Sequence, residues 1–171
     1  MFLWIFYVLE CVQNISLKHL FNKQIYKMES IKHLLLINSP RDKVYKAIST
    51  IDGLSNWWTN DTKGDSKPGG EIEFRFGTYP PLILKVSELK ENEIVEWKCE
   101  TDMMGWKDTK LKIFLDDQDN QTRIRFEHSN WKETDDDFAA VSFTWTRYLS
   151  SLKQFCQTGK GEAFGSPDYR T

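Results

Sequence analysis

The side chains that could do chemistry in this chain are mostly aromatic. Its 171 residues include seven Trp, six Tyr and eleven Phe, but only three His. Trp and Tyr combine a large apolar face with one polar group. Small-molecule sites have this composition, because they are apolar cavities with a few orienting hydrogen bonds. The same side chains also build a filled core, and the sequence does not distinguish the two because it gives no volume.

The three histidines are the natural acid–base candidates. His19 lies in the N-terminal segment, and His33 is expected to be exposed on the first strand. His128 shares a strand face with apolar residues and is expected to point inward, where hydrogen-bonded core histidines are common. His128 and Tyr148 are therefore the candidates for general acid–base chemistry. No matched pair of titratable groups can be placed, so no catalytic residue is assigned.

Neither a metal nor a cofactor is expected. The carboxylate runs Asp116–Asp117 and Asp135–Asp137 fall in a predicted turn and at a predicted helix start, where Asp has local structural reasons to occur. Cys11, Cys99 and Cys156 are odd in number and show no CxxC spacing. No HExxH, GxSxG, P-loop or GxGxxG pattern occurs. Reduced thiols and a cytoplasmic location are the simplest interpretation.

Charge and length restrict the class of protein. Lys and Arg number 23 and Asp and Glu number 25, which gives a formal net charge of −2. No basic stripe with interleaved aromatics is present, so no nucleic-acid partner is expected. The length and the 40% hydrophobic content indicate one soluble domain.

Residues 1–30 are expected to be an extension of that domain. The opening run MFLWIFYVL ends at Glu10, which makes it too short to span a bilayer, and it lacks the features of a signal peptide. It could be a membrane-surface helix, because lysines follow it, or a peripheral helix that docks on the domain. It could also be foreign to the natural protein, because Met28 precedes a well-formed domain start. We favour this last interpretation.

Two short helices are expected after a first strand over residues 31–38. Ser39 is a suitable N-cap and Pro40 suits the first position of a helix that continues through residue 50. After a break at Asp52–Gly53, a second short helix should carry the adjacent pair Trp57 and Trp58.

Alternating apolar and polar residues then predict an antiparallel meander with one face buried. Its five strands are expected over residues 71–77, 82–89, 93–101, 106–117 and 121–130, with Met103–Gly105 as a hairpin tip. A final helix should begin at the N-cap Thr134, with Asp137 completing a capping box, and should stop at Gly159. Its apolar stripe requires cover, and the sheet is the only partner large enough.

Five segments carry a family resemblance: SPRDKVYKAIST, GLSNWWT, PGGEIEFRFG, EIVEWKCE and TWTRYLSSLKQFCQTGKG. Together they resemble the helix-grip domains of the START-like (SRPBCC) superfamily. Within it, they resemble the family named for the C-terminal domain of the activator of Hsp90 ATPase. The resemblance covers residues 31–165 and leaves residues 166–171 as a tail. It implies an α+β fold in which a curved antiparallel sheet of about six strands wraps around a long C-terminal helix.

In that superfamily a cavity lies between the sheet and the long helix. One of Trp57 and Trp58 would then close the core while the other lines the cavity; alternatively, both belong to the core. The candidate ligand-binding residues are the large side chains expected to face inward. They are Trp57, Trp58, Phe74, Phe76, Leu84, Trp97, Trp106, Phe126, His128, Trp145 and Tyr148.

Three functions follow from the resemblance and the aromatic content. The first is binding of a small apolar or aromatic molecule, without a defined catalytic activity. The second is stimulation of a chaperone ATPase, as the family name implies, with a homodimer as a further form of protein association. The third is a cyclase or dehydratase that uses the same cavity. A fold alone does not decide among them.

Overall fold

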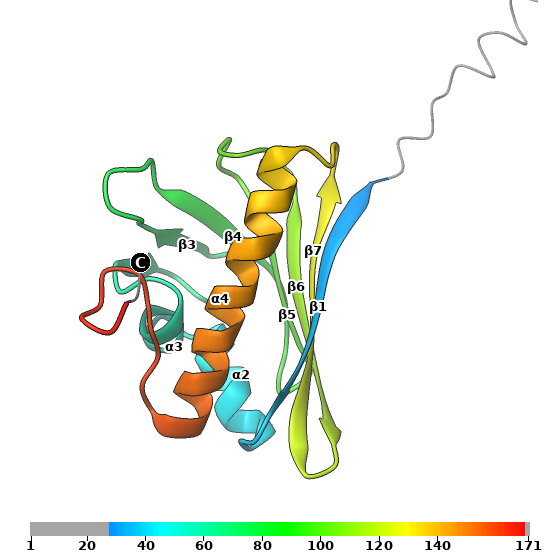
Figure 1. The fold of residues 1–171 in the computed structure, drawn as a ribbon, viewed down its shortest axis with the longest axis vertical. Helices are drawn as coiled ribbons and strands as arrows, with labels where there is room; N and C mark the ends of the chain where they lie inside the picture. The colour runs from blue at the N-terminus through cyan, green and yellow to red at the C-terminus, as the bar shows by residue number, and fades with distance from the viewer. Residues whose placement is uncertain (1–27, 170–171) are drawn as a thin grey trace, which may run out of the picture.

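The computed structural model describes residues 28–169, so the predictions for residues 1–27, which include His19 and Cys11, lie outside the described residues. It contains one seven-stranded antiparallel sheet and three helices (Figure 1). The strands are β1 (Glu29–Ile37), β2 (Thr62–Gly64), β3 (Glu71–Phe74), β4 (Leu82–Lys90), β5 (Ile94–Cys99), β6 (Lys110–Gln118) and β7 (Gln121–Trp131). The helices are α2 (Arg41–Ser49), α3 (Ile51–Trp57) and α4 (Asp136–Thr158).

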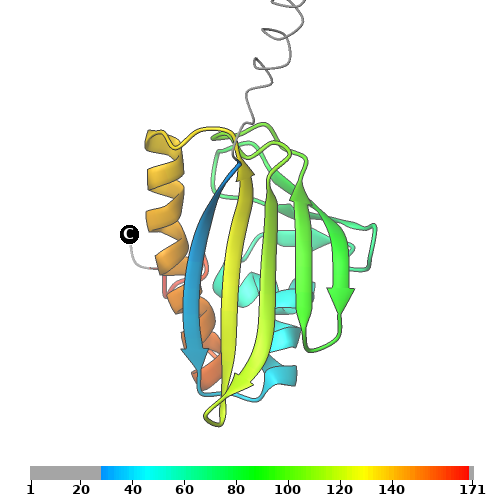
Figure 2. The same cartoon turned by 90° about the vertical axis from the view of Figure 1, so that its right-hand side faces the viewer.

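The sheet and the helices form two layers. The strand order is β1-β7-β6-β5-β4-β3-β2, so β2 to β7 form a meander and β1 joins its far edge. Helix α4 lies along the inner face of the sheet, with α2 and α3 beside it (Figure 1). In Figure 2, α2 and α3 lie behind the strands and α4 stands beside the β1 edge, so no helix crosses the outer face of the sheet. This arrangement confirms the predicted helix-grip fold, and the short strand β2 is the element that the sequence did not indicate.

The two faces of the sheet follow from alternation along the strands. On β6, Leu111, Ile113 and Leu115 are buried against the helices. The outward residue Asp116 accepts hydrogen bonds from Arg123 on β7, 2.8 Å from Nε, and from Arg125. The hydrogen bond from Arg123 holds the pKa of the Asp116 carboxyl at about 2.

Strand β1 presents the face opposite to the predicted one. Its inward residues include Ile31, Leu35 and Ile37, and His33 shares this side, with its ring centroid 6.1 Å from that of Phe126. Leu34, on the other face, is 68% exposed. The prediction failed because apolar residues occupy both the odd and the even positions of this strand, so the sequence pattern does not show which face is buried.

Both helix N-caps lie one residue later than predicted. Pro40 is the N-cap of α2, with extended backbone angles and no side-chain capping bond, so Ser39 precedes the cap. On α4 the N-cap is Asp135 instead of Thr134, and its carboxylate accepts from the amide of Phe138 at 3.0 Å. Asp135 supplies the same hydrogen bond that Thr134 would have made, so the cap chemistry is conserved and the register differs.

The connection between β5 and β6 is longer than the predicted hairpin tip at Met103–Gly105. It covers residues 100–109 and folds back on itself through backbone bonds from Asp108 to Cys99 and from Thr109 to Trp106. Its turn places the indole of Trp106, which is 7% exposed, over the core. Within residues 28–169, no helix is both long enough and apolar enough to cross a membrane.

Candidate functional site

The adjacent tryptophans at the end of α3 have different surroundings. Trp57 is buried, and its Nε1 donates to the carbonyl of Ala47 on α2 at 2.9 Å. Trp58 is also buried, but its ring meets several aromatic rings, among them Phe74 at 4.3 Å and Trp145 at 5.0 Å between centroids. The two indoles stack on each other at 5.7 Å. Trp57 therefore ties α3 to α2, while Trp58 joins an aromatic cluster.

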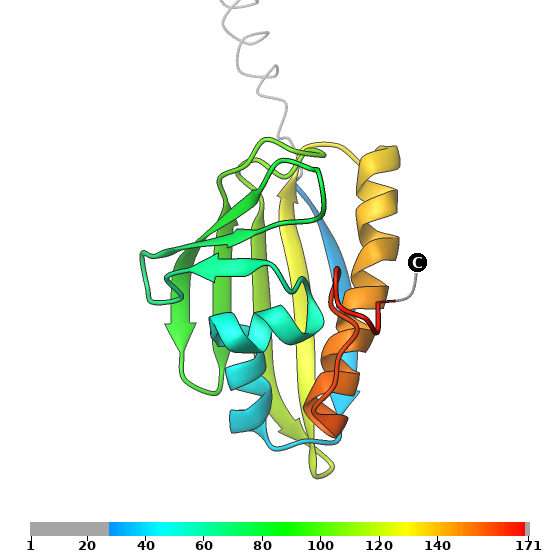
Figure 3. The same ribbon diagram turned by 90° about the vertical axis from the view of Figure 1, so that its left-hand side faces the viewer.

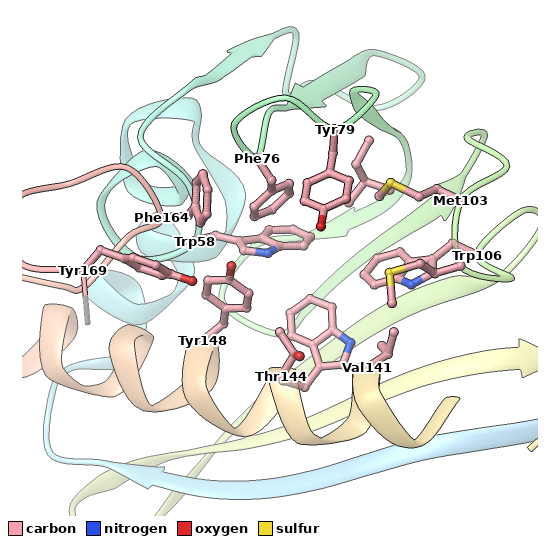
Figure 4. Close-up of a pocket in the computed structure, with 13 residues that line it drawn as sticks. Trp58, Phe76, Tyr79, Met103, Trp106, Val141, Thr144, Tyr148, Phe164 and Tyr169 are labelled. Carbon is pink, nitrogen blue, oxygen red and sulfur yellow. The ribbon is translucent and has the colours of Figure 1, made fainter. Parts of the chain in front are cut away.

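Beside this cluster lies a pocket of about 260 Å³, partly open to solvent (Figure 4). It is enclosed by α4, the residues around β3 and β4, the 100–109 connection and the segment after α4. Its lining consists of Trp58, Phe76, Tyr79, Leu82, Met103, Met104, Trp106, Val141, Thr144, Trp145, Tyr148, Phe164 and Tyr169. None of these thirteen side chains carries a formal charge at neutral pH.

Helix α4 supplies the floor of the pocket. Val141, Thr144, Trp145 and Tyr148 recur at intervals of three and four residues, so they project from one helix face. The left-handed Gly159, with φ of 81°, ends the helix and turns the chain back.

The segment after α4 returns along the helix (Figure 3). Its residues Phe164 and Tyr169 close one side of the pocket. Phe164 is held by backbone bonds in both directions, its amide donating to Trp58 and its carbonyl accepting from Asn60. Its ring meets Phe76 at 5.5 Å and Tyr169 at 5.0 Å. The sequence indicated only a loop here, so Phe164 and Tyr169 were missed, although two aromatics in a loop could have suggested a packed segment.

The predicted site residues divide into two groups. Those that line the pocket are Trp58, Phe76, Trp106, Trp145 and Tyr148. Those that pack in the core without lining it are Trp57, Phe74, Leu84, Trp97, Phe126 and His128. Six further lining residues were absent from the prediction besides Phe164 and Tyr169: Tyr79, Leu82, Met103, Met104, Val141 and Thr144. Several of these come from loops and from the rim, where apolar periodicity gives no signal.

His128 is fully buried beneath the pocket, and both its ring nitrogens are engaged. Nδ1 accepts from Nε1 of Trp145 at 3.2 Å, and Nε2 lies 2.9 Å from Oγ1 of Thr109. Because Nδ1 accepts, the proton of the neutral ring must be on Nε2, which donates to Thr109. Burial lowers the pKa of His128 to about 3. The ring is therefore neutral at physiological pH and has no free nitrogen for acid–base chemistry.

Tyr148 and the two buried cysteines are also neutral at physiological pH. Burial, reinforced by the neighbouring Tyr169, raises the pKa of the Tyr148 hydroxyl. Cys99 and Cys156 are buried, unpaired thiols, and burial raises the pKa of each, to about 11 and about 12. Among residues 28–169 no cluster of three metal-ligating side chains forms.

Comparison with known proteins identifies the family of this chain. Residues 38–157 match the family described as activator of Hsp90 ATPase homolog 1-like protein. The solution structure of the Aha1 dimer from Colwellia psychrerythraea is 38% identical, with a TM-score of 0.71, over 78% of this chain and 99% of that chain. No match was found among curated proteins.

Two more distant structures share the fold alone. Protein SSP2350 from Staphylococcus saprophyticus is 17% identical, with a TM-score of 0.65, over 79% of this chain and 97% of that chain. CalU16 from Micromonospora echinospora is 18% identical, with a TM-score of 0.63, over 77% of this chain and 78% of that chain. The family match covers well over half of the sequence, and the predicted resemblance is confirmed: the chain belongs to the activator of Hsp90 ATPase homolog 1-like family.

Proposed function

We propose that this domain binds a small apolar or aromatic molecule in the pocket between α4 and the sheet. The observation that carries this proposal is the uncharged, largely aromatic lining of a pocket of about 260 Å³. A volume of this order approaches the roughly 300–1,000 Å³ of known ligand sites. Partly exposed rim residues, Tyr79 at 68% and Met104 at 43%, suit a mouth through which an apolar compound enters.

To test this proposal, a large side chain is introduced into the pocket. Ligand binding by this variant is compared with that of a variant that carries the same substitution outside the pocket. Thr144 and Thr146 are both exposed on α4, but only Thr144 lines the pocket. Native mass spectrometry of the wild type should show a co-purified compound that is lost on denaturation, or a panel of aromatic compounds should raise its Tm. Thr144→Trp should abolish either signal and Thr146→Trp should retain it. If the wild type shows neither signal, or if both variants behave alike, the proposal is wrong.

Self-association is a second candidate, and one observation favours it. Phe143 is 80% exposed on α4, and a second copy of the domain would remove its apolar ring from water. The 38% identical structure from Colwellia psychrerythraea is described as a dimer. Light scattering should then give a dimer for the wild type and a monomer for Phe143→Glu. A monomeric wild type at high concentration would remove this candidate.

Chaperone stimulation rests on the family description, and an ATPase assay with a cognate chaperone tests it. A cyclase or dehydratase receives less support, because His128 has no free ring nitrogen and Tyr148 stays protonated.

The unpaired thiols Cys99 and Cys156 support a reducing, cytoplasmic location. Residues 31–165 are the proposed limits of the domain.

A further inference from the structure

The charge of the pocket lining restricts the ligand class, and this inference rests on the function proposed above. All thirteen lining side chains are neutral, and Tyr148 stays protonated because burial raises its pKa. Arg147 brings a positive charge near, with its guanidinium 3.9 Å from the Tyr169 ring centroid. It stacks on that ring and is not one of the lining residues, so the lining itself contains no counter-ion. An ionised ligand would lose its hydration there without gaining a partner.

The spacing of the rings restricts the shape. Trp145 packs directly against two neighbouring rings, with centroid distances of 5.0 Å to Trp58 and 5.8 Å to Trp106 and planes tilted by 49° and 31°, so the three indoles form one continuous wall of ring faces and edges. Flat aromatic compounds pack best against such faces and edges. At protein packing density, the pocket would hold about 190 Å³ of ligand, the volume of two or three fused rings.

The hydroxyl groups of the lining determine which hydrogen bonds a ligand can make. Thr144 donates its hydroxyl to the carbonyl of Ala140 at 2.8 Å, and Tyr148 shares a hydrogen bond with Tyr169. The hydroxyl of Tyr79 has no hydrogen-bond partner within residues 28–169. Figure 4 shows this hydroxyl directed toward α4 across the mouth. Tyr79 therefore offers an uncommitted hydrogen-bond donor and acceptor to a ligand.

We propose that the pocket selects an uncharged, flat compound of two or three rings, and that Tyr79 binds an oxygen atom of that compound. Three probes of similar size separate the claims: naphthalene, 2-naphthol and naphthalene-2-carboxylate. Their binding to the wild type and to Tyr79→Phe can be measured through quenching of tryptophan fluorescence. Tyr79 is 68% exposed, and the variant keeps its ring, so the fold is not at risk.

For the wild type, 2-naphthol should bind at least about tenfold more tightly than the carboxylate, because the lining holds no cation and one neutral hydroxyl does not replace the hydration that the carboxylate loses. Tyr79→Phe should weaken 2-naphthol about fivefold, the size of one hydrogen bond, and should leave naphthalene unchanged. Equal or tighter binding of the carboxylate would overturn the charge selection. An unchanged affinity for 2-naphthol in the variant would overturn the role of Tyr79. Either result leaves the proposed binding function in place, whereas failure of all three probes to bind would remove both.

Discussion

The indole Nε1 of Trp145 donates a hydrogen bond to Nδ1 of His128, 3.2 Å away and out of reach of solvent. Trp145 lines the pocket on one side, and His128 holds it from the other. Oγ1 of Thr109 fixes the histidine in turn at 2.9 Å, and donates to the carbonyl of Trp106 at 2.6 Å. Two residues that line the pocket, Trp145 and Trp106, are thus connected by buried hydrogen bonds through His128 and Thr109.

The buried hydrogen bonds of His128 predict that the stability of the folded protein depends on acid pH. The pKa of His128 is about 3 in the folded protein and about 6.5 when unfolded. Because the unfolded state binds the proton first, stability should fall as the pH drops below 6.5, by up to about 1.4 kcal/mol per pH unit. Urea unfolding between pH 7.5 and pH 5 measures this slope, and the range ends before most carboxylates titrate.

The matched variant is His128→Gln, which cannot take up the proton. It should be less stable than the wild type at pH 7.5, because the amide replaces a ring that packs edge-on against Trp106 and Trp131. Its stability should nevertheless change less between pH 6.5 and pH 5. Parallel slopes for the two proteins would mean that His128 does not titrate as described.

The adjacent tryptophans should respond differently to the same substitution. Trp57→Phe removes the donor to Ala47 and leaves that carbonyl unpaired, so we expect a loss of about 2–3 kcal/mol in unfolding free energy. Ligand affinity should stay unchanged, because Trp57 does not line the pocket. Trp58→Phe should weaken ligand binding, because Trp58 does line it. Denaturant unfolding and ligand titration measure both effects, and equal affinity losses would contradict the division of roles.

Gly161 should control the closing segment after α4. A Cβ atom at this position would lie 2.2 Å from the carbonyl oxygen of Asn56, so Gly161→Ala must push the segment away from α3. We expect a loss of about 1–3 kcal/mol in stability, together with weaker ligand binding as Phe164 is displaced. Lys160→Ala, at an exposed neighbouring position, is the control. If Gly161→Ala behaved like Lys160→Ala in thermal unfolding, the close packing would be refuted.

A chain beginning at Met28 should fold with unchanged stability. The sheet and the core described here are formed by residues from Glu29 onward. The Tm of the shortened protein should therefore equal that of the full chain within error. A Tm several degrees lower would show that residues 1–27 stabilise the domain and would favour a docked helix.

The sequence predicted the fold well where periodicity and capping carry the information. Strand β5 alternates throughout, β4 as far as Val86, β6 as far as Asp116 and β7 as far as His128, and Gly159 ends α4 as expected. It failed at β1, where both parities are apolar, and in the 100–109 connection, where turns set by Met104 and Asp108 at positive φ have no simple pattern. Local signals do not report which face of an all-apolar strand meets the helices.

The site was predictable in part for a related reason. Trp145 and Tyr148 follow from helical spacing on α4, whereas the sequence left open which of Trp57 and Trp58 would line the pocket. Tyr79, Phe164 and Tyr169 reach the pocket through loops, whose course depends on tertiary contacts such as the bond between Phe164 and Trp58. Position on a regular element was therefore not decisive by itself: Val141 and Thr144 on α4 were missed, whereas Phe76 and Trp106 were predicted although they lie in connections between strands.

The pairing of β1 with β7 also affects how the chain folds. Ile31 lies opposite His128, so the first strand of the sheet finds its partner only after nearly the whole domain is in place. The hairpins from β3 to β7 need only short loop closures, whereas this pairing closes a very long one. Such distant contacts slow folding. Until β1 docks, the edge of β7 is unpaired, and this edge is where a partly folded chain could pair with another copy.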